Sequence, residues 1–305
     1  MIEVTIVSVN CRGLKQKINS GVFLLQETHS QKSDEEKWQK EWGSRLQMNH
    51  GSSNSRGTMI GFSKNLDLKN FYCDQDNIGR IQVISFQLEE KAFIIANLYN
   101  NNVQSEQVET LKKLSQMIEA TNTFEKEIII GGDFNFIFDK NLDAYGGMPD
   151  LKLQSIAEIT KIKNKFDLCD IYRIRNPQKK LYTYRKPNHR LLRRLDFFIC
   201  SNSLRDNVLK TDVLASIDSD HSPVILKICD VDDNTRRPSF WKFPAMLAKD
   251  LEYVNKLKLL IRNTKNSLAE ASHQFTWEFV KYKIREFTIE YSKNKAKLRK
   301  IRKMN

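Results

Sequence analysis

The residues in this sequence that can do chemistry are carboxylates, side-chain amides and one histidine, each next to a short apolar run. Asn10, for example, directly follows Thr-Ile-Val-Ser-Val, and Asp133 follows Ile-Ile-Ile-Gly-Gly. Since strand ends in α/β folds hold ligand-binding side chains, these positions predict one shared site. The residues of this kind are Asn10, Glu27, Asp133, Asn135, Asp196, Asp220 and His221.

A cluster of carboxylates in one small volume requires a cation. At ~4 Å and an effective dielectric of ~20, each pair of like charges costs ~4 kcal/mol. Oxygen ligands select Mg²⁺ or Mn²⁺ over zinc. A neutral imidazole beside the metal, polarised by a carboxylate, adds a donor that stabilises charge on a phosphate. The predicted chemistry is therefore metal-dependent hydrolysis of a phosphate ester.

Each of these residues also has a structural explanation when it is taken alone. An Asp or Asn after a strand is commonly a turn residue, Glu27 fits a solvated strand end, and His221 fits a buried structural histidine. Tyr99 ends the run Asn97-Leu98-Tyr99, where its hydroxyl either reaches a phosphate or belongs to a half-buried strand tyrosine. The combination of residues, more than any single one, favours a site.

The elements that must position these residues are short strands and amphipathic helices. Predicted helices cover 34–42, 105–120 and 151–166. Many short strands with both tight and helical connections predict an α/β fold with two layered sheets, in preference to a doubly wound sheet. The predicted strands are 5–9, 22–25, 58–62, 81–87, 92–98, 128–130, 182–184, 195–199 and 224–228.

The C-terminal quarter differs from the rest in charge. Residues 236–305 hold 18 Lys and Arg against 6 Asp and Glu, whereas residues 1–235 hold 32 against 31. We expect a domain over 1–229, a polar linker over 230–243 and a basic helical extension over 244–305. The extension is either an electrostatic footprint for nucleic acid or a solvated, Lys-rich pair of helices.

Composition excludes several classes of protein. Hydrophobic residues make up 40% of the chain, which is enough for a full core, and no apolar run approaches membrane-spanning length. The five cysteines are scattered and contain no Cys-x-x-Cys pair, which argues against a disulfide framework or a zinc site. Without a signal-peptide pattern, we expect a nuclear or cytoplasmic monomer that has no membrane partner.

Six motifs, in order across residues 1–229, closely resemble the endonuclease/exonuclease/phosphatase superfamily. They are Ser-Val-Asn10-Cys-Arg-Gly-Leu, Leu-Gln-Glu27-Thr-His, Asn-Leu-Tyr99, Gly-Gly-Asp133-Phe-Asn135, Arg-Leu-Asp196-Phe and Ser219-Asp220-His221-Ser-Pro. The segments beginning at Asp143, Asp170, Phe240 and Glu286 look most like the endonuclease region of LINE-type (non-LTR) retrotransposon proteins. The resemblance implies a four-layer α/β/β/α sandwich, and we expect no reverse transcriptase in this chain.

The resemblance also implies a metal site. Glu27 would be the principal ligand of Mg²⁺, or of Mn²⁺, with Asn10 and Asp220 completing the site. Asp133 would orient or deprotonate the attacking water, and Asn135 would hold the phosphate and that aspartate.

The remaining roles that the resemblance implies concern the substrate. His221, paired with Asp196, would bind the scissile phosphate, Tyr99 would assist there, and Thr183 would touch the DNA backbone. The implied function is DNA strand nicking that leaves a 3′-hydroxyl and a 5′-phosphate, with RNA a further partner of the basic tail. The alternatives are an abasic-site repair endonuclease and a catalytically impaired relic that only binds nucleic acid.

One segment departs from the superfamily pattern. Only the twelve residues 10–21 separate two strands that the family places in parallel, with a helix crossing between them. A parallel crossover normally takes at least ~10–12 residues including its helix. Because Asn10 and Glu27 lie on either side of it, we hypothesise that the shortened crossover loosens the metal site and lowers activity.

Overall fold

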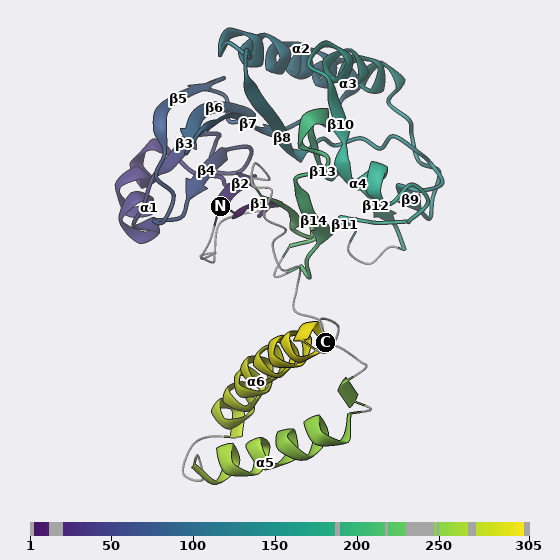
Figure 1. Cartoon of the computed structure of the whole chain (residues 1–305). Helices are drawn as coiled ribbons and strands as arrows, with labels where there is room; N and C mark the ends of the chain where they lie inside the picture. The colour runs from purple at the N-terminus through teal and green to yellow at the C-terminus, as the bar shows by residue number, and fades with distance from the viewer. Residues whose placement is uncertain are drawn as a thin grey trace. The chain divides into compact units, whose positions relative to one another are not determined.

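The strands of the first part of the chain form two six-stranded sheets that lie face to face (Figure 1). The first sheet has the order β14-β15-β1-β2-β4-β3. Its strands are β1 (Glu3–Asn10), β2 (Val22–Gln26), β3 (Leu46–Asn49), β4 (Thr58–Phe62), β14 (Val208–Val213) and β15 (Val224–Cys229). The second sheet has the order β10-β13-β8-β7-β6-β5. Its strands are β5 (Lys69–Gln75), β6 (Ile81–Leu88), β7 (Lys91–Tyr99), β8 (Lys126–Asp133), β10 (Leu168–Asp170) and β13 (Asp196–Ser201).

Helices cover the outer face of each sheet (Figure 1). On the first sheet this is α1 (Glu35–Trp42), which follows the short 3-10 helix η1 (Lys32–Asp34). On the second sheet they are α2 (Gln104–Ala120) and α3 (Leu153–Lys165). The predicted two-sheet α/β/β/α sandwich is therefore confirmed. The smaller elements are α4 (Ile171–Arg175), η2 (Asn202–Leu204) and a three-stranded sheet of β9 (Ala144–Tyr145), β11 (Tyr184–Arg185) and β12 (Leu192–Arg193).

This computed structural model describes residues 3–11, 21–186, 190–216, 219–229, 247–248, 250–267 and 273–301. Contacts divide the chain into two compact units, Met1–Asp233 and Asn234–Asn305. The predicted linker 230–243 lies outside the described residues, and the predicted domain boundaries stay predictions. Among the described helices, none is long and apolar enough to cross a membrane.

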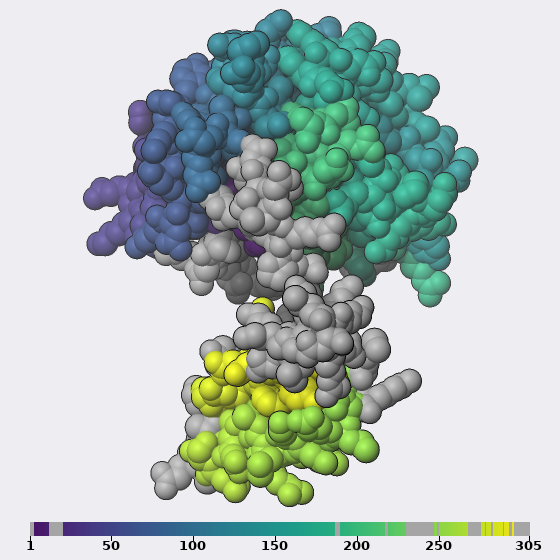
Figure 2. Space-filling view, viewed as in Figure 1, coloured from purple at the N-terminus to yellow at the C-terminus, as the bar shows by residue number. Residues whose placement is uncertain are grey.

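Alternating side chains on the strands build the core layers. On β1, Ile6 packs in the cluster between the two sheets, whereas the next residue, Val7, packs in the cluster under α1 with Trp42. On β7, Ile95 belongs to the inter-sheet cluster, and Ile94 packs with residues of α2 and α3. In the space-filling view, the blue and the teal-to-green parts of the first unit lie side by side (Figure 2).

The strands that the sequence analysis missed are mainly edge strands. β3, β5 and β14 each lie at the edge of a sheet and carry polar residues, as in Lys-Asn-Phe-Tyr-Cys-Asp-Gln of β5. Such strands lack the alternating apolar pattern, because only part of each is buried. The prediction of a strand over 182–184 is wrong, since β11 covers only Tyr184–Arg185.

The second unit is a helical hairpin of α5 (Leu251–Ser267) and α6 (His273–Ile301). Tyr253 of α5 stacks on Phe287 of α6 with ring centroids 5.6 Å apart, and its hydroxyl lies 2.6 Å from that of Thr288. Two apolar residues of the last helix, Phe287 and Tyr291, thus pack on Tyr253 of the preceding helix.

Strand register brings the polar residues at the strand ends to one end of both sheets. β1 and β2 are parallel, with Asn10 opposite Gln26. In the second sheet Asp133 is opposite Tyr99 on the parallel strand β7 and opposite Asp196 on the antiparallel strand β13. Gly132 allows this pairing, because a Cβ there would lie 1.9 Å from the Leu98 carbonyl oxygen at a φ of +145°.

A buried polar link joins the sheets just below this end. Asn97 of β7 donates from Nδ2 to the backbone carbonyls of Leu25 and Met59, both at 3.0 Å. Its Oδ1 accepts a 2.7 Å hydrogen bond from Nε2 of Gln26, which also donates to the Ser8 hydroxyl. Asn97 lies two residues before Tyr99, and Gln26 one residue before Glu27, so the link supports residues of the site from below.

The variant Asn97→Ala is expected to lower the free energy of unfolding by about 1–3 kcal/mol, because it removes three buried hydrogen bonds, one from Gln26 and two to backbone carbonyls. Urea unfolding of the variant and of Asn65→Ala, an exposed asparagine, gives the comparison. Equal midpoints for the two variants would show that the link does not stabilise the fold.

Candidate active site

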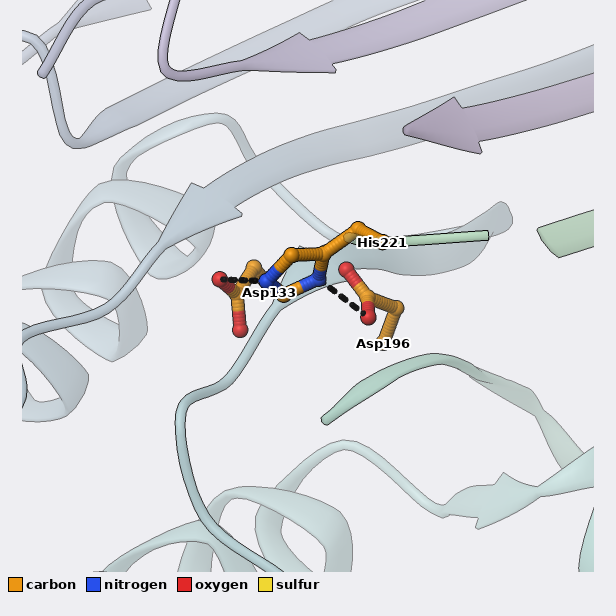
Figure 3. Close-up of side chains that lie close together, drawn as sticks. All are labelled: Asp133, Asp196 and His221. Atoms are coloured by element: carbon orange, nitrogen blue, oxygen red, sulfur yellow. Dashed lines mark hydrogen bonds and ion pairs between the residues drawn. The ribbon is translucent and has the colours of Figure 1, made fainter. Parts of the chain in front are cut away.

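Contacts at this end of the sheets connect four buried side chains. Nδ2 of Asn10 donates to Oδ2 of Asp133 at 3.0 Å. Nε2 of His221 lies 4.0 Å from the same Asp133 oxygen, and its Nδ1 lies 2.8 Å from Oδ2 of Asp196. Figure 3 shows the histidine ring between the two carboxylates. These residues are widely separated in the sequence, and the fold brings them together.

The two carboxylates change the charge state of His221. Burial alone lowers the pKa of this imidazole, but the negative charges of Asp196 and Asp133 outweigh burial and raise the pKa to about 9. The ring is therefore protonated at neutral pH, with Nδ1–H donated to Asp196 and Nε2–H directed at Asp133. Two anionic neighbours thus share the buried site of His221, and the neutral imidazole expected beside a bound metal ion stays a prediction.

The surroundings of Asp133 raise the pKa of its carboxyl group. Burial raises the pKa of its carboxyl, and the charge of Asp196 raises it further. His221 and the hydrogen bond from Asn10 lower it, which leaves a pKa of about 7. A carboxyl group that exchanges its proton near neutral pH is suited to general acid–base chemistry.

Asn135 is held against Asp133 by its backbone. Its amide donates to Oδ1 of Asp133 at 2.9 Å, and its φ of 54° lies in the left-handed region that is uncommon for residues other than glycine. Its Nδ2 donates to the Asn100 carbonyl at 2.9 Å.

Two residues that the sequence analysis missed hold the backbone of Asn135. Nε2 of Gln107 donates to the carbonyls of Asn135 at 3.0 Å and Asn101 at 2.6 Å. Nζ of Lys152 donates to the carbonyls of Asn135 at 3.2 Å and Asn102 at 2.5 Å. Together they tie the loop after β8 to the loop after β7.

Glu27 and Tyr99 form the second part of the site. The Tyr99 hydroxyl donates to Oε1 of Glu27. Burial first, and then Glu27 as hydrogen-bond partner and charge, raise the pKa of Tyr99 far above its usual range, so the phenol keeps its proton. Glu27 has a φ of 50°, and the next residue, Thr28, donates its amide to the Gly57 carbonyl at 3.1 Å.

The segment that carries Asp220 and His221 is fastened to β1 of the first sheet and to β11 of the small sheet. The Ser219 hydroxyl donates to the Asn10 carbonyl at 3.0 Å and accepts the His221 amide at 3.1 Å. The carbonyl of Asp220 accepts the Arg185 amide at 2.8 Å. The charge of Asp220 also contributes to the raised pKa of His221, which places this carboxylate near the histidine.

Thr183 lies in the site, but in a different position from the one expected of a DNA contact. Its side chain is 0% exposed, and its hydroxyl accepts the amides of Leu195 and Asp196, each at 3.0 Å. Its carbonyl accepts the Ser222 amide at 2.6 Å. These contacts position Asp196 and His221, and contact with DNA stays a prediction that would require this buried side chain to become exposed.

Arg194 links the segments that begin at Asp143 and Asp170. Its buried guanidinium binds both carboxylate oxygens of Asp170, at 2.7 and 2.8 Å, and lies 3.7 Å from Asp143. Arg194 also donates its amide to the Asp143 carbonyl at 2.9 Å. Because Arg194 precedes Leu195 and Asp196, this ion-pair network sets the backbone from which Asp196 projects.

The donor chemistry of the site fits a divalent cation held by oxygen. Asp133, Asp196 and His221 bring one ligand atom each within 4.8 Å of one another. The His221 nitrogen atoms are engaged with two carboxylates, however, so this group is not a ready metal triad. Among the described residues, the buried Oδ1 of Asn10 and Oδ1 of Asp196 accept no hydrogen bond. The first of these is an oxygen that can complete a Mg²⁺ site.

Comparisons with known proteins agree with this fold. No family model matches the chain. A curated relative, the transposon TX1 uncharacterized 149 kDa protein of Xenopus laevis, is 24% identical over 276 residues, 90% of this chain. The chain spans about a fifth (21%) of the length of that relative.

Solved structures show the fold. AP endonuclease LMAP from Leishmania major has a TM-score of 0.59 at 17% identity, with 74% of this chain and 87% of that one covered. An AP endonuclease from Archaeoglobus fulgidus has a TM-score of 0.57 at 16% identity, with 73% and 98% covered. The endonuclease domain of TRAS1, a telomere-specific non-LTR retrotransposon, has a TM-score of 0.52 at 14% identity, with 74% and 98% covered. The chain thus has the endonuclease/exonuclease/phosphatase fold.

In the metal-free protein, stability is expected to fall as the pH rises from 6.5 to 9. The fold raises the pKa of His221 from its ordinary value of 6.5 to about 9. Between these pH values the folded state therefore binds more protons than the unfolded state. The stabilising contribution is complete below pH 6.5 and is lost as the pH passes through about 9. The raised pKa of Asp133 acts in the same direction between pH 3.8 and 7.

Thermal unfolding in EDTA at both ends of this window tests the expectation. The advantage of the wild type over His221→Asn should be larger at pH 6.5 than at pH 9. His29→Asn is the control for loss of an imidazole, since asparagine accommodates the left-handed backbone at that position. An advantage that stays constant with pH would contradict the charged state assigned to His221.

Proposed function

We propose that the first unit is a metal-dependent DNA endonuclease that hydrolyses phosphodiester bonds, nicks one strand and leaves a 3′-hydroxyl and a 5′-phosphate. The observation that carries this proposal is the contact chain from Asn10 through Asp133 and His221 to Asp196, at the end of both sheets. A general acid–base carboxyl, a cationic donor and an oxygen-rich cation site are the groups that hydrolysis of a phosphate diester needs.

Glu27, Asn10 and Asp220 would hold the cation. Mg²⁺ suits this set of oxygen donors, and Mn²⁺ is the alternative. When bound, the ion supplies Lewis acidity and a template for the phosphate. The orientation of the Asn10 oxygen is fixed, because Nδ2 of the same amide donates a hydrogen bond to Asp133.

Asp133 would take the proton from the attacking water. Its Oδ1 is fixed by the Asn135 amide and its Oδ2 by Asn10, so the carboxyl is oriented before substrate arrives. A pKa of about 7 lets it be ionised in a large fraction of molecules and still accept a proton. The Asn135 side chain would hold the phosphate beside it.

His221 would bind the scissile phosphate with Nε2–H, while Asp196 holds Nδ1–H and sustains the positive charge. A charged donor in a buried site stabilises the negative charge that develops on the phosphate oxygens. Tyr99 keeps its proton and would donate a hydrogen bond to the phosphate or the leaving oxygen. Thr183 and Arg194 would contribute indirectly, because they hold Asp196 in position.

The proposed substrate follows the relatives. TRAS1 is described as a retrotransposon and its matched domain as an endonuclease, and the relative from Xenopus laevis is a transposon protein. A retrotransposon endonuclease that nicks target DNA is therefore the leading proposal. Two matched structures are AP endonucleases, so repair of abasic sites is the second. RNA binding by the basic tail and a monomeric state remain predictions.

Supercoiled-plasmid nicking with Mg²⁺ tests the function. Nicking is expected to stop in EDTA, and Asp133→Ala or His221→Ala is expected to lower the rate by roughly 10²–10⁴-fold, as for loss of a general acid or base. Asp67→Ala, an exposed aspartate, is the matched control and should nick at the wild-type rate.

The outcomes separate the competing functions. Nicking that survives both substitutions would refute the assigned roles of Asp133 and His221. Cleavage confined to duplexes with an abasic site would favour the repair enzyme. A salt-sensitive DNA complex without any nicking would favour the impaired relic.

Gln107→Leu is expected to lower kcat with little change in KM, because the carbonyls of Asn101 and Asn135 lose their shared donor. A 1 Å shift at a catalytic group can cost on the order of 10²-fold in rate. Gln116→Leu, an exposed glutamine on the same helix, should leave kcat unchanged. Equal rates for both variants would show that the Gln107 side chain does not position the site.

A further inference from the structure

The loop that begins at Glu27 has an uncommon backbone conformation. Glu27 and His29 have φ values of 50° and 51°, in the left-handed region that residues other than glycine seldom adopt. Thr28, between them, donates its amide to the Gly57 carbonyl at 3.1 Å, and His29 donates its amide to the Arg56 carbonyl at 3.0 Å. Such a conformation costs free energy and persists only where neighbouring groups hold it. The supports of this loop therefore determine how the Glu27 carboxylate is presented.

Side chains of this loop and of two other elements form a hydrogen-bonded series. The Thr28 hydroxyl lies 3.2 Å from the Ser30 hydroxyl, which lies 3.0 Å from Nδ1 of His50. Nε2 of His50 lies 2.8 Å from Oε1 of Glu35. Because His50 follows β3 and Glu35 is the first residue of α1, the series links the loop to both elements.

The carboxylate of Glu35 sets the direction of the hydrogen bonds in this series. A carboxylate only accepts, so Nε2 of His50 carries a proton, and Nδ1 of the neutral ring accepts the Ser30 hydroxyl. The Ser30 oxygen is then the acceptor for the Thr28 hydroxyl. Each hydroxyl of the loop thus has an acceptor, and the series ends at the half-exposed side chain of Glu35.

The order of hydroxyl, imidazole and carboxylate also occurs in the triads of serine hydrolases. In this chain, however, Ser30 is only 2% exposed and Thr28 only 4%, so a substrate cannot reach either hydroxyl. The series is therefore a support of the loop and no second active site.

The backbone beside His50 is held independently of the loop. The preceding residue, Asn49, is fully buried, and its Nδ2 donates to Asp76 at 2.8 Å and to the Ile81 carbonyl at 3.0 Å. Since Ile81 is the first residue of β6, these contacts join the end of β3 to the second sheet. The Ser30 hydroxyl thus bonds to a ring that projects from a fixed backbone and is held again at Glu35.

We infer that Ser30 and His50 are positioning residues, which hold the left-handed loop and thereby preset the Glu27 carboxylate for a divalent cation. The inference rests on the proposed function and deepens it, because it assigns supports to the principal metal ligand. The Tyr99 hydroxyl already restrains the Glu27 side chain from the second sheet, and the series restrains the backbone that follows Glu27. Groups that orient a metal ligand without touching the ion contribute roughly 10–100-fold to metal affinity.

Two substitutions of His50 separate its two contacts. Asparagine places its amide near the position of Nδ1 and keeps a partner for Ser30, whereas glutamine places its amide near that of Nε2 and keeps only the partner for Glu35. Binding of Mn²⁺ to the full chain without DNA, followed by the electron paramagnetic resonance signal of the free ion, gives the affinity. E27Q identifies the site. S30A and H50Q should weaken the Glu27-dependent binding by about tenfold, and H50N should bind as the wild type does.

S201A is the matched control for S30A. Ser201 is also buried, and its hydroxyl accepts the Ile128 amide at 2.8 Å, at the opposite end of β13 from Asp196. S201A should bind Mn²⁺ with the wild-type affinity. Equal losses in S201A and S30A, or in H50N and H50Q, would show a general effect of stability or side-chain volume and would overturn the inference.

Hydrogen exchange of the metal-free chain gives a second readout. The amides of Thr28 and His29 should exchange several-fold faster in S30A and H50Q and at the wild-type rate in H50N, with the amides of β8 unchanged in all three. Unchanged exchange at these two amides, or Glu27-dependent binding that S30A and H50Q leave intact, would overturn the inference while nicking by the wild type still supports the proposed function. A wild type that binds Mn²⁺ through Glu27 in the expected pattern and does not nick would refute the proposed endonuclease and leave the roles of Ser30 and His50 intact.

Discussion

The buried hydrogen bonds of Asn97 are the constraint on which the site depends. Two facing sheets in a sandwich are held mainly by non-directional apolar packing, which does not define their relative position along the strands. Asn97 adds direction, because its amide group must meet two carbonyls of the first sheet and the Gln26 side chain at once. An unpaired amide at this depth is costly, so the ends of β2 and β7 stay in one relative position.

That constraint explains why a single site draws on both sheets. Glu27 and Asn10 come from the first sheet, and Tyr99 and Asp133 come from the second. The contacts between Asn10 and Asp133 and between Tyr99 and Glu27 then cross from one sheet to the other. Burial at this site raises the pKa of Asp133, and the carboxylates that the fold gathers here raise the pKa of His221. The packing of the two sheets at this end therefore also sets the electrostatics of the site.

Sequence reasoning could find the residues whose polarity breaks an apolar pattern, and this is why the strand-end residues and the two-sheet fold were predictable. It could not find Gln107, Lys152 or Arg194, because their roles arise from contacts across long sequence separations, such as the 28 residues between Gln107 and Asn135. The resemblance predicts that Thr183 touches the DNA backbone, whereas its hydroxyl is buried and accepts the amides of Leu195 and Asp196. The charge of His221 was also beyond reach, since it depends on two carboxylates that only the fold brings near.

The shortened crossover between β1 and β2 bears on the same point. Its residues 12–20 lie outside the described part of the chain, whereas the strands on either side are described. These keep a continuous parallel register from Ile6 and Val22 to Asn10 and Gln26. Asn10 is held from the far side by Ser219 and Asp133, and the loop after Glu27 is held by Gly57 and Arg56. None of these contacts comes from the crossover. The described supports of Asn10 and of the loop after Glu27 therefore lie outside residues 12–20, and an effect of the shortened crossover on the metal site stays a hypothesis.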